Sequence, residues 1–538
     1  ERDLAQEDIE AGVRLNDEGI YKSSLPSFTG PTHTLLSPEE YRAKVRGLNA
    51  QQKQVVMFHR DWCKQVIKDP QTPPYHVFLS GPGGVGKSHV IDVIYNDTMK
   101  LLRLKGDLQP EDIPVLLTAP TGTAAFNIDG NTLHSTFSIG KAINKYQNLP
   151  FEKRNTLRSK FQNLKLLIID EVSMVSPDLL NFVHRRLQEI LGLSDEDTIF
   201  GNVSVLAVGD LYQLKPIARD YVCGMPTDDM AKLAGSMWKE HFRIVELREI
   251  MRQRDDKAFA ELLNRVRQGT CTEDDINVLQ QREIPETDPD FPTQALHVFT
   301  TNRAVDTHND KMLEASCTNI YSLKAIDSQR DEQTGQARVP VSATASEAGL
   351  SPELCIAAGA RVTLTYNVNV QDGLSNGAQG AVQAIVKTAD GEVDTILVVF
   401  DNERVGKDAI SKSLHRRRYP HAVPIKRIVA NCGTNYTKRR CQFPLRLCWA
   451  STIHKVQGLT LDKIVVCMNT AFEPGQAYVA LSRVKSLSGL YISHFDAKKI
   501  KAHPDAVAEM KRLSSRAIPP TPIPAGFHIP PQSCIHIC

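Results

Sequence analysis

The chain has 538 residues, so at about 150 residues per domain it should form three or four domains. Hydrophobic residues make up 41% and charged residues 23%, a composition typical of folded globular proteins that argues against wholesale disorder. Apolar runs stay well short of the roughly 18 residues of a membrane span, so a transmembrane protein is excluded. The formal net charge of +2 gives, taken alone, no indication of a nucleic-acid partner.

The 11 cysteines are scattered and mostly lie in apolar stretches, as Cys448 and Cys467 do. This is typical of reduced thiols, so we expect a reducing compartment: cytosol, nucleus or mitochondrial matrix. The chain begins at Glu1 without a methionine, and we expect any targeting segment to be missing from it. The terminal residues include metal-ligating types, which we interpret as part of an unstructured end: His528, Cys534, His536 and Cys538.

Residues 1–45 carry no motif that can be interpreted and form an N-terminal extension. Beyond them, continuous apolar runs predict strands buried on both faces of a parallel sheet. These runs are 77–79, 115–117, 166–169, 203–208, 296–299 and 464–466. Helical patterns alternate with them, for example over 177–191 with Ser176 as N-cap. The order predicts an α/β fold with its chemistry at the carboxyl ends of the strands.

Three further stretches are predicted to lack regular structure. The polar segments 284–293 and 327–350 are predicted loops, and residues 513–538, with six prolines, are predicted to be a disordered tail.

A complete phosphate-loop motif, GPGGVGKS, follows the first predicted strand and precedes an amphipathic helix. Glycines let backbone N–H groups surround phosphate oxygens, while the lysine reaches the terminal phosphates and the serine ligates Mg²⁺. The motif therefore predicts an ATP–Mg²⁺ site made of Gly81, Pro82, Gly83, Gly84, Val85, Gly86, Lys87 and Ser88.

Two further strand ends carry polar groups suited to hydrolysis. Asp170 and Glu171 follow the run LLII, and we expect Asp170 to join the Mg²⁺ shell and Glu171 to polarise the attacking water. Gln213 lies in GDLYQLKP after another strand, where an amide can sense the terminal phosphate.

An ordered set of motifs follows the phosphate loop. They are TAPTGTAAFNI (118–128), GNTLHSTF (130–137), IIDEVSMV (168–175), GDLYQLKPI (209–217), LREIMRQ (247–253), FTTNRAVDTHN (299–309), GARVTLTYNVNVQDGLSNGAQGAV (359–382), WASTIHKVQGLTLD (449–462) and GQAYVALSRV (475–484). Over residues 46–500 this set resembles the Pif-type, RecD-like DNA helicases of superfamily one, closest in spelling to those of rolling-circle transposons and their cellular relatives.

The resemblance implies two RecA-like domains, at 46–245 and 246–512. It places an insertion at 138–163 in the first and a small β-barrel at about 371–440 in the second. Gln52 would read adenine, Arg252 and Arg483 would reach the γ-phosphate from the second domain, and Gln457 and Gly458 would adjoin the nucleotide. A lone arginine is more often a surface ion pair, and only the motif context favours this role.

DNA contacts are implied at strand-end loops of both domains. They involve Pro120, Thr121, His134, Thr301, Asn302, Thr452, His454 and Lys455. Such hydroxyls, amides and a lysine suit phosphate binding without sequence reading. His134 has an alternative interpretation as a packed core histidine, and Val456 stands where the family often has serine.

The charge is distributed unevenly. Residues 404–440 carry a net +10 and residues 138–163 a net +5, which leaves −13 on the remainder. The second window also contains Tyr146, Phe151 and Phe161, and basic segments with aromatics are typical of single-strand binding. Solvated surface is the alternative for both windows, and nuclear import is a further alternative for residues 415–418.

The resulting hypothesis is an ATP-dependent DNA helicase that moves along single-stranded DNA and opens forked or tailed duplexes. The resemblance implies 5′-to-3′ polarity, work in repair, recombination and telomere maintenance, action as a monomer, and a nuclear location with the mitochondrion as alternative. Two other hypotheses are the motor portion of a rolling-circle transposase and a DNA-binding protein with a vestigial ATPase.

Overall fold

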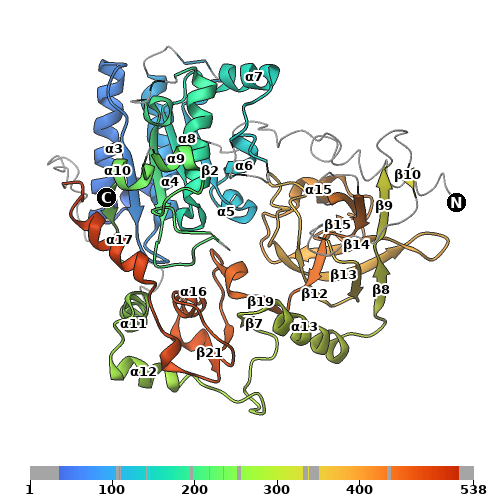
Figure 1. The fold of residues 1–538 in the computed structure, drawn as a ribbon. Coiled ribbons are helices and arrows are strands. Elements are labelled where there is room, and N and C mark those ends of the chain that lie inside the picture. The colour runs from blue at the N-terminus through green and yellow to red at the C-terminus, as the bar shows by residue number, and fades with distance from the viewer. Residues whose placement is uncertain are drawn as a thin grey trace, which may run out of the picture.

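The computed structural model describes residues 35–519, apart from 105–107, 110, 141–142, 144–145, 194, 196–197, 217–218, 234, 251–255, 331–336, 339–349 and 433–437. Two parallel sheets with flanking helices lie one above the other in Figure 1, and a largely antiparallel region lies beside them. The predicted α/β class is therefore confirmed. Within the described ranges, no helix is both long and apolar enough to cross a membrane.

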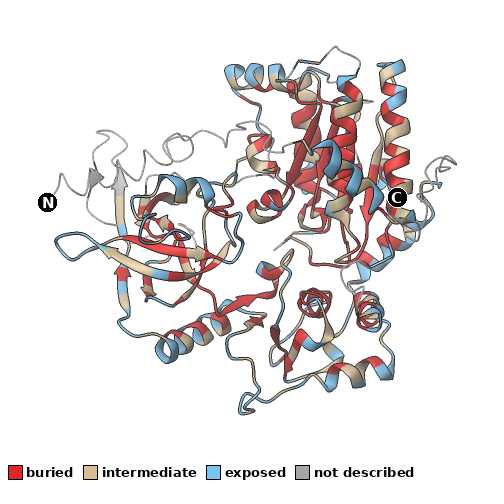
Figure 2. Cartoon of the chain, turned by 180° about the vertical axis from the view of Figure 1, so that it is seen from behind, coloured by how far each residue is buried: buried red, intermediate tan, exposed pale blue. Residues whose placement is uncertain are grey.

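The first domain is built on a six-stranded parallel sheet in the order β3-β2-β4-β5-β1-β6. Its strands are β1 (His76–Ser80), β2 (Val115–Ala119), β3 (Asn131–Thr132), β4 (Leu166–Ile169), β5 (Ser204–Gly209) and β6 (Arg243–Glu246). All four predicted runs of this domain are strands. Their residues are almost entirely buried, since helices cover both faces of the sheet (Figure 2).

The first domain contains helices on both sides of its sheet, several of which begin with a capping side chain. These helices are α2 (Pro38–Arg46), α3 (Ala50–Lys68), α4 (Lys87–Arg103), α5 (Gly122–Asn127), α6 (Leu133–Thr136), α7 (Phe151–Phe161), α8 (Pro177–Leu191), α9 (Asp229–Leu233) and α10 (Met237–His241), with 3-10 turns η1 (Val172–Met174) and η2 (Ile199–Asn202). In α8 the Ser176 hydroxyl accepts a hydrogen bond from Leu179 N, and Gly192 ends the helix in the left-handed conformation. The predicted helix over 177–191 and its N-cap are confirmed.

The second domain has a four-stranded parallel sheet in the order β19-β7-β20-β21. Its strands are β7 (Leu296–Phe299), β19 (Ala450–Thr452), β20 (Ile464–Cys467) and β21 (Leu490–Ser493). Its helices are α11 (Lys257–Gln268), α12 (Glu273–Gln280), α13 (Asn302–Ser316) and α16 (Gln476–Leu481), with turns η3 (Ile453–Val456), η4 (Leu487–Gly489) and η5 (Ala497–Lys499). The predicted loop 284–293 is confirmed.

The insertion in the second domain is larger than predicted. It contains β8 (Tyr321–Lys324), β9 (Ile326–Arg330), β10 (Ala337–Arg338), β11 (Glu353–Ile356), β12 (Arg361–Leu364), β13 (Gln379–Lys387), β14 (Val393–Phe400), α15 (Lys407–Lys412), β15 (Val423–Ile425), β16 (Ile428–Cys432), β17 (Lys438–Gln442) and β18 (Leu445–Leu447). The bounds 371–440 were too narrow because β12 and β18, which lie outside that range, belong to the same sheet as β13. In the described part, the main sheet runs β15-β14-β13-β12-β18 and its edge strands do not pair to close a barrel. The predicted loop 327–350 was wrong where β9 and β10 form a ladder.

The C-terminal helix α17 (Pro504–Ser514) returns to the first domain. Trp238 Nε1 donates to Glu509 Oε1 at 2.9 Å, and Ala517 forms a parallel bridge with Ile244 of β6. The predicted second-domain boundary at 512 and tail start at 513 therefore need correction, since this segment packs against the first domain. The remainder of the predicted tail, with its histidines and cysteines, lies outside the described residues.

We expect Trp238→Ala to lower the free energy of unfolding by about 3–5 kcal/mol, because a large buried ring is lost. The indole stacks on Phe242 at 4.5 Å between ring centroids and contacts the edge of Phe78 at 5.1 Å. Denaturant unfolding followed by circular dichroism measures the change. Trp238→Phe is the matched control, because it keeps most of the ring volume and removes the N–H bond to Glu509. Equal stability of Trp238→Ala and wild type would contradict this packing.

Candidate functional site

The predicted phosphate loop lies between β1 and α4. Gly84 and Gly86 have φ values of +89° and +79°, which side chains other than glycine rarely adopt. Lys87 Nζ donates to the carbonyls of Gly81 at 2.7 Å and Pro82 at 3.0 Å, and Ser88 is exposed at the start of α4. A loop that curls around its own ammonium group is arranged to accept phosphate oxygens.

Lys87 lies close enough to three carboxylates to interact with them electrostatically. Burial lowers the pKa of Lys87, while Asp210, Glu171 and Asp170 oppose this shift. All three carboxylates are at the ends of β4 and β5, as expected for neighbouring parallel strands. The predicted convergence of these strand ends on the phosphate loop is therefore present.

Gln52 packs directly beneath the phosphate loop. Its side-chain nitrogen donates to Val85 O at 2.8 Å, and its oxygen accepts from Asn49 N at 2.9 Å in a capping box at the start of α3. A Cβ on Gly86 would lie 2.5 Å from that nitrogen, so Gln52 also explains why this position is glycine. Gln52 thus supports the loop, and its role in reading adenine stays a prediction.

Asp170 and Glu171 have different environments. Burial, with a contribution from Glu171, raises the pKa of Asp170 to about 7. Glu171 has a left-handed backbone with φ of +51°, and its Oε2 is buried with no hydrogen-bond partner among the described residues. A carboxylate oxygen held in this way is free to accept a proton from a water molecule.

A magnesium ion fits these side chains. Asp170 and the exposed Ser88 would hold it, because hard oxygen ligands few in number and supplemented by phosphate suit Mg²⁺. The described residues contain no group of three His, Cys, Asp or Glu side chains arranged as a metal site.

The loop after β5 carries Gln213. Its side chain is 3% exposed, and its amide oxygen is buried without a hydrogen bond to any described residue. Tyr221 donates to the Gln213 carbonyl at 3.1 Å and so holds the backbone of this loop. The position is consistent with the predicted sensing role, which stays a prediction.

Residues of the second domain reach this set of strand ends. Gln457 donates to the Ser173 hydroxyl at 3.0 Å, and a Cβ on Gly458 would lie 3.7 Å from Glu171 Oε1. Gln457 and Gly458 therefore lie next to Ser173 and Glu171 of the first domain, and their predicted contact with the nucleotide stays a prediction. Arg483 is buried but bonds within its own domain, to Val479 O at 2.7 Å and Ser482 Oγ at 2.7 Å. Arg252 lies outside the described residues.

The loops predicted to bind DNA in the first domain lie at the insertion. Thr121 caps α5 by accepting from Ala124 N at 3.3 Å, and Pro120 is half-buried before it. Thr123 donates to Asn376 O of the insertion at 2.6 Å. His134 is half-buried in α6, and burial lowers its pKa, so it is intermediate between a surface contact and a core histidine.

The corresponding residues of the second domain are at the ends of β7 and β19. Thr301 caps α13, and both Thr301 and Asn302 are exposed. Thr452 is buried, His454 is half-buried and Lys455 is exposed in η3. The neighbouring Val456 is fully buried in the core, which explains why a hydrocarbon side chain serves at this position.

The prediction that the aromatic residues of the basic segment 138–163 contribute to single-strand binding was wrong for two of the three. Phe161 is fully buried against Phe137. The Tyr146 ring packs on Phe182 and its hydroxyl donates to Glu189 at 2.5 Å. Phe151, 68% exposed, is the one aromatic of the three left open for base stacking. The apolar faces of this segment build the first domain, which composition alone could not distinguish from a binding surface.

The basic 404–440 segment is also partly neutralised. Arg440 is buried and makes two bonds of 2.7 Å to Asp327. Arg404 pairs with Asp129, and Lys412 with Asp408 at 2.7 Å. The exposed cations Arg416, Arg417 and Arg418 form one run on the surface.

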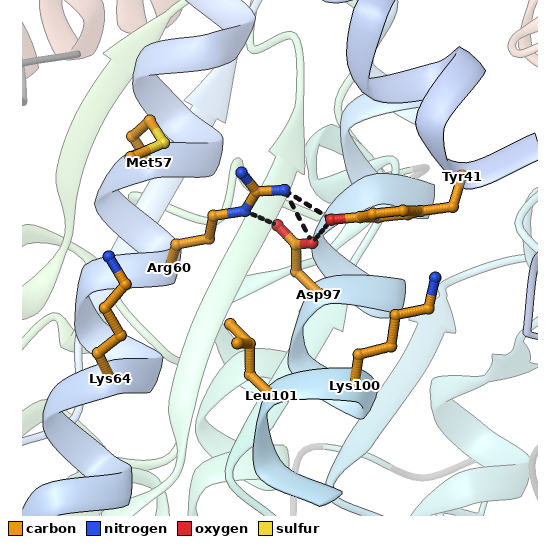
Figure 3. A pocket seen from close by; sticks show the side chains of 7 residues that line it. All are labelled: Tyr41, Met57, Arg60, Lys64, Asp97, Lys100 and Leu101. Carbon is orange, nitrogen blue, oxygen red and sulfur yellow. Dashed lines mark hydrogen bonds and ion pairs between the residues drawn. The ribbon is translucent and has the colours of Figure 1, made fainter. Parts of the chain in front are cut away.

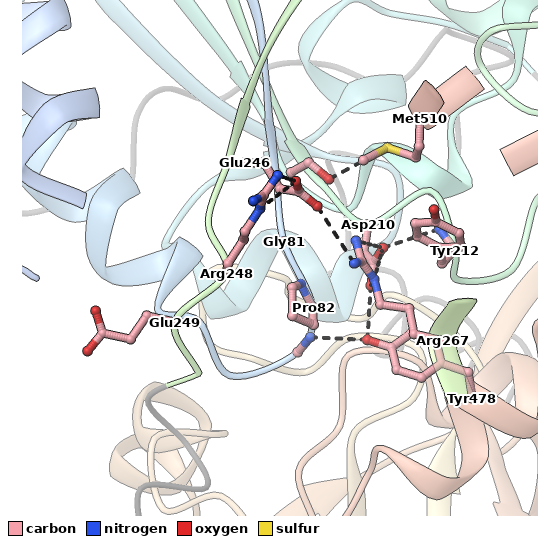
Figure 4. A network of polar contacts seen from close by, with 12 residues as sticks. Gly81, Pro82, Asp210, Tyr212, Glu246, Arg248, Glu249, Arg267, Tyr478 and Met510 are labelled. Atoms are coloured by element: carbon pink, nitrogen blue, oxygen red, sulfur yellow. Dashed lines mark hydrogen bonds and ion pairs between the residues drawn. The ribbon is translucent and has the colours of Figure 1, made fainter. Parts of the chain in front are cut away.

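Three polar residues between the two domains have no role predicted from their sequence pattern. Arg267 of α11 and Tyr478 of α16 both bond Asp210, at the end of β5 (Figure 4). Asp210 lies in the motif 209–217 at the end of a strand, and Tyr478 lies in the motif 475–484 within a buried helix. A polar group at such a position was the available sign of a functional role. Arg267 lies in an amphipathic helix outside any motif, so the sequence around it gives no sign of a functional role.

Gln51 is a fourth such residue. Its side-chain oxygen accepts from Arg248 N at 2.8 Å and Glu249 N at 3.3 Å, at the start of the connection between the domains. Gln51 and Gln52 together join α3 to this connection and to the phosphate loop.

A separate hollow of the first domain lies between α2, α3 and α4 (Figure 3). Arg60 and Asp97 form an ion pair of 2.5 Å in it, and Arg60 donates to the Tyr41 hydroxyl at 2.6 Å. Burial, with Asp97, raises the pKa of Tyr41 to about 12. These groups satisfy one another, and they lie along the helices and away from the strand ends, so we do not assign the nucleotide to this hollow.

Known proteins share this arrangement. Residues 47–277 match the PIF1-like helicase family. The ATP-dependent DNA helicase PIF1 of Xenopus laevis is 31% identical over 432 residues, covering 80% of this chain and 60% of the relative. The chain thus spans about three fifths of the length of the curated relatives that it matches.

Solved structures agree with the sequence matches. A structure of two coordinating Pif1 helicases at forked double-stranded DNA has a TM-score of 0.62 and 26% identity, with 87% of this chain and 97% of that chain covered. Bacteroides Pif1 in complex with ADP-AlF3 and single-stranded DNA has a TM-score of 0.60 and 26% identity, with 84% and 96% covered. The predicted resemblance is confirmed: residues 47–277 match the PIF1-like helicase family, and most of the chain is similar in sequence and in structure to Pif1 helicases.

Proposed function

We propose that the chain is an ATP-dependent DNA helicase that couples hydrolysis to movement along single-stranded DNA. The main support is that residues of both domains meet at one site, where we place the nucleotide. Lys87 and Glu171 belong to the first domain, and Gly458 of the second domain lies close to Glu171. Hydrolysis at such an interface changes how the domains fit together, which is the requirement for a motor.

The substrates follow from the relatives. Related structures hold single-stranded DNA and forked duplex, and we propose the same substrates here, with 5′-to-3′ movement and work in repair, recombination and telomere maintenance. ATP is the substrate nucleotide and Mg²⁺ the ion held by Ser88 and Asp170. One chain supplies both walls of the site, which supports action as a monomer, and the exposed Arg416–Arg418 run supports a nuclear location.

The proposal is tested by strand separation of partial duplexes that carry either a 5′ or a 3′ single-stranded tail. We expect wild type with ATP to open the 5′-tailed duplex alone. Lys87→Ala should lose DNA-stimulated hydrolysis by about 10²–10³-fold, because a preorganised charge on the phosphates is removed. Equal hydrolysis by both proteins would indicate a vestigial site, and opening of the 3′-tailed substrate alone would reverse the polarity.

The exposed arginines give a further expected result. Replacing Arg416, Arg417 and Arg418 together with alanine should reduce the slope of log affinity for single-stranded DNA against log salt by about 2, since each released counterion contributes about 0.7. Fluorescence anisotropy over a salt series measures it. Lys426→Ala is the matched control, because Lys426 already faces Asp394 at 3.8 Å. An unchanged slope in the triple variant would favour the nuclear-import interpretation of this run.

A further inference from the structure

Asp210 of the first domain bonds two side chains of the second domain, Arg267 and Tyr478. It is fully buried at the end of β5, and Arg267 of α11 donates from Nε to its two oxygens at 3.0 and 3.1 Å. A second guanidinium nitrogen lies 2.8 Å from Oδ1, and the guanidinium stacks over the Tyr212 ring at 4.4 Å. Arg267 is 3% exposed, so both charges of this interdomain pair are removed from water.

Tyr478 connects the same carboxylate to the phosphate loop. Its hydroxyl donates to Asp210 Oδ2 at 2.9 Å and accepts from Gly83 N at 3.4 Å (Figure 4). Gly83 is one of the loop amides expected to face the nucleotide phosphates. A tyrosine of the second domain therefore occupies a donor that a bound phosphate needs.

The two contacts differ in strength. Separating Arg267 from Asp210 would leave a charge buried without its partner, which is among the costliest single changes in a protein interior. The Tyr478–Gly83 bond is neutral and long, and a phosphate oxygen is a charged and stronger acceptor for the same N–H group. Nucleotide should therefore break the second contact and leave the first intact.

We propose that Arg267 and Tyr478 are positioning residues. They couple the binding of nucleotide phosphates in the phosphate loop to movement of the second domain. The Arg267–Asp210 pair is a fixed pivot, and the Tyr478 hydroxyl is a latch on Gly83 that a nucleotide phosphate displaces. Release of the latch frees α16, and with it Arg483 two residues beyond its C-terminal end, to turn about the pivot. This inference rests on the proposed nucleotide site and adds the residues that couple it to domain motion.

Tyr478→Phe tests the latch. Phenylalanine fills the same space but cannot accept from Gly83 or donate to Asp210. The loop amide is then free before nucleotide arrives, while Arg267 still pairs with both oxygens of Asp210. We expect the variant to bind fluorescent ADP and a non-hydrolysable ATP analogue about two- to tenfold more tightly than wild type, the effect of one competing hydrogen bond. A purely structural tyrosine would give unchanged or weaker binding, and either result would overturn the latch.

Tyr75→Phe is the matched control. It removes a hydroxyl that bonds His59 at 2.8 Å, at the opposite end of β1 from the phosphate loop, and should leave nucleotide affinity unchanged. All binding is measured without DNA. Failure of wild type to bind nucleotide would contradict the proposed function, whereas normal wild-type binding with no gain in Tyr478→Phe would contradict the latch alone.

Hydrogen exchange of the wild-type chain tests the pivot separately. We expect the ATP analogue to increase amide exchange over residues 476–481 while residues 257–268 stay protected. Unchanged exchange at 476–481 would oppose release of the latch. Loss of protection at 257–268 would show that Arg267 leaves Asp210, and the pivot would be wrong.

Discussion

Glu171→Gln should reduce the rate of ATP hydrolysis by about 10²–10⁴-fold while nucleotide still binds, because the amide cannot take a proton from water. The structure gives Glu171 the required features. Its backbone is held in a left-handed turn, and one carboxylate oxygen is buried with no partner in the described part of the chain. Glutamine has the same shape, so the loss should fall on the chemical step.

Single-turnover hydrolysis and equilibrium binding of a fluorescent nucleotide separate these two effects. Glu249→Gln is the matched control: its carboxylate is exposed on the connection between the domains and points away from the network of Figure 4. We expect its rate to stay near that of wild type. A Glu171→Gln rate within tenfold of wild type would assign the role of base to another group.

The architecture of both motor domains could be predicted because buried parallel strands leave a strong local signal. All six continuous apolar runs, from 77–79 to 464–466, are strands of the two parallel sheets. The insertion could not be bounded in the same way. Its strands are antiparallel, and the pairing of β12 with β18 joins segments about 80 residues apart in the chain, which no local pattern records.

The residues of the site also differ in whether the sequence alone could identify them. The phosphate loop and Asp170-Glu171 are contiguous motifs, so their residue types and spacing are sufficient to find them. Arg267 is a lone arginine whose importance arises from its burial against Asp210, 57 residues away in sequence. Burial also overturned the stacking roles of Tyr146 and Phe161, because an aromatic among cations has the same composition on a surface and in a core.

Arg483→Ala should lower the rate of hydrolysis by about 10³–10⁵-fold, the effect of an arginine that stabilises the transferring phosphoryl group from across an interface. Its guanidinium is buried and bonds Val479 O and Ser482 Oγ. It is therefore held ready at the end of α16, the helix whose Tyr478 contacts the phosphate loop. We expect motion of α16 on nucleotide binding to bring Arg483 to the phosphates.

Because Arg483 bonds groups in and just after α16, its replacement needs a control for loss of local structure. Ser482→Ala removes the acceptor at 2.7 Å and keeps the arginine, so its hydrolysis rate should stay within a few-fold of wild type. Arg483→Lys keeps the charge but cannot place two parallel donors on a phosphate, so it should restore little of the lost rate. If Arg483→Ala instead melts earlier and hydrolyses normally per bound nucleotide, Arg483 serves only to hold α16 together. A low rate with unchanged nucleotide affinity and unchanged melting would place it at the reacting phosphate, because only a contact made in the transition state affects the rate alone.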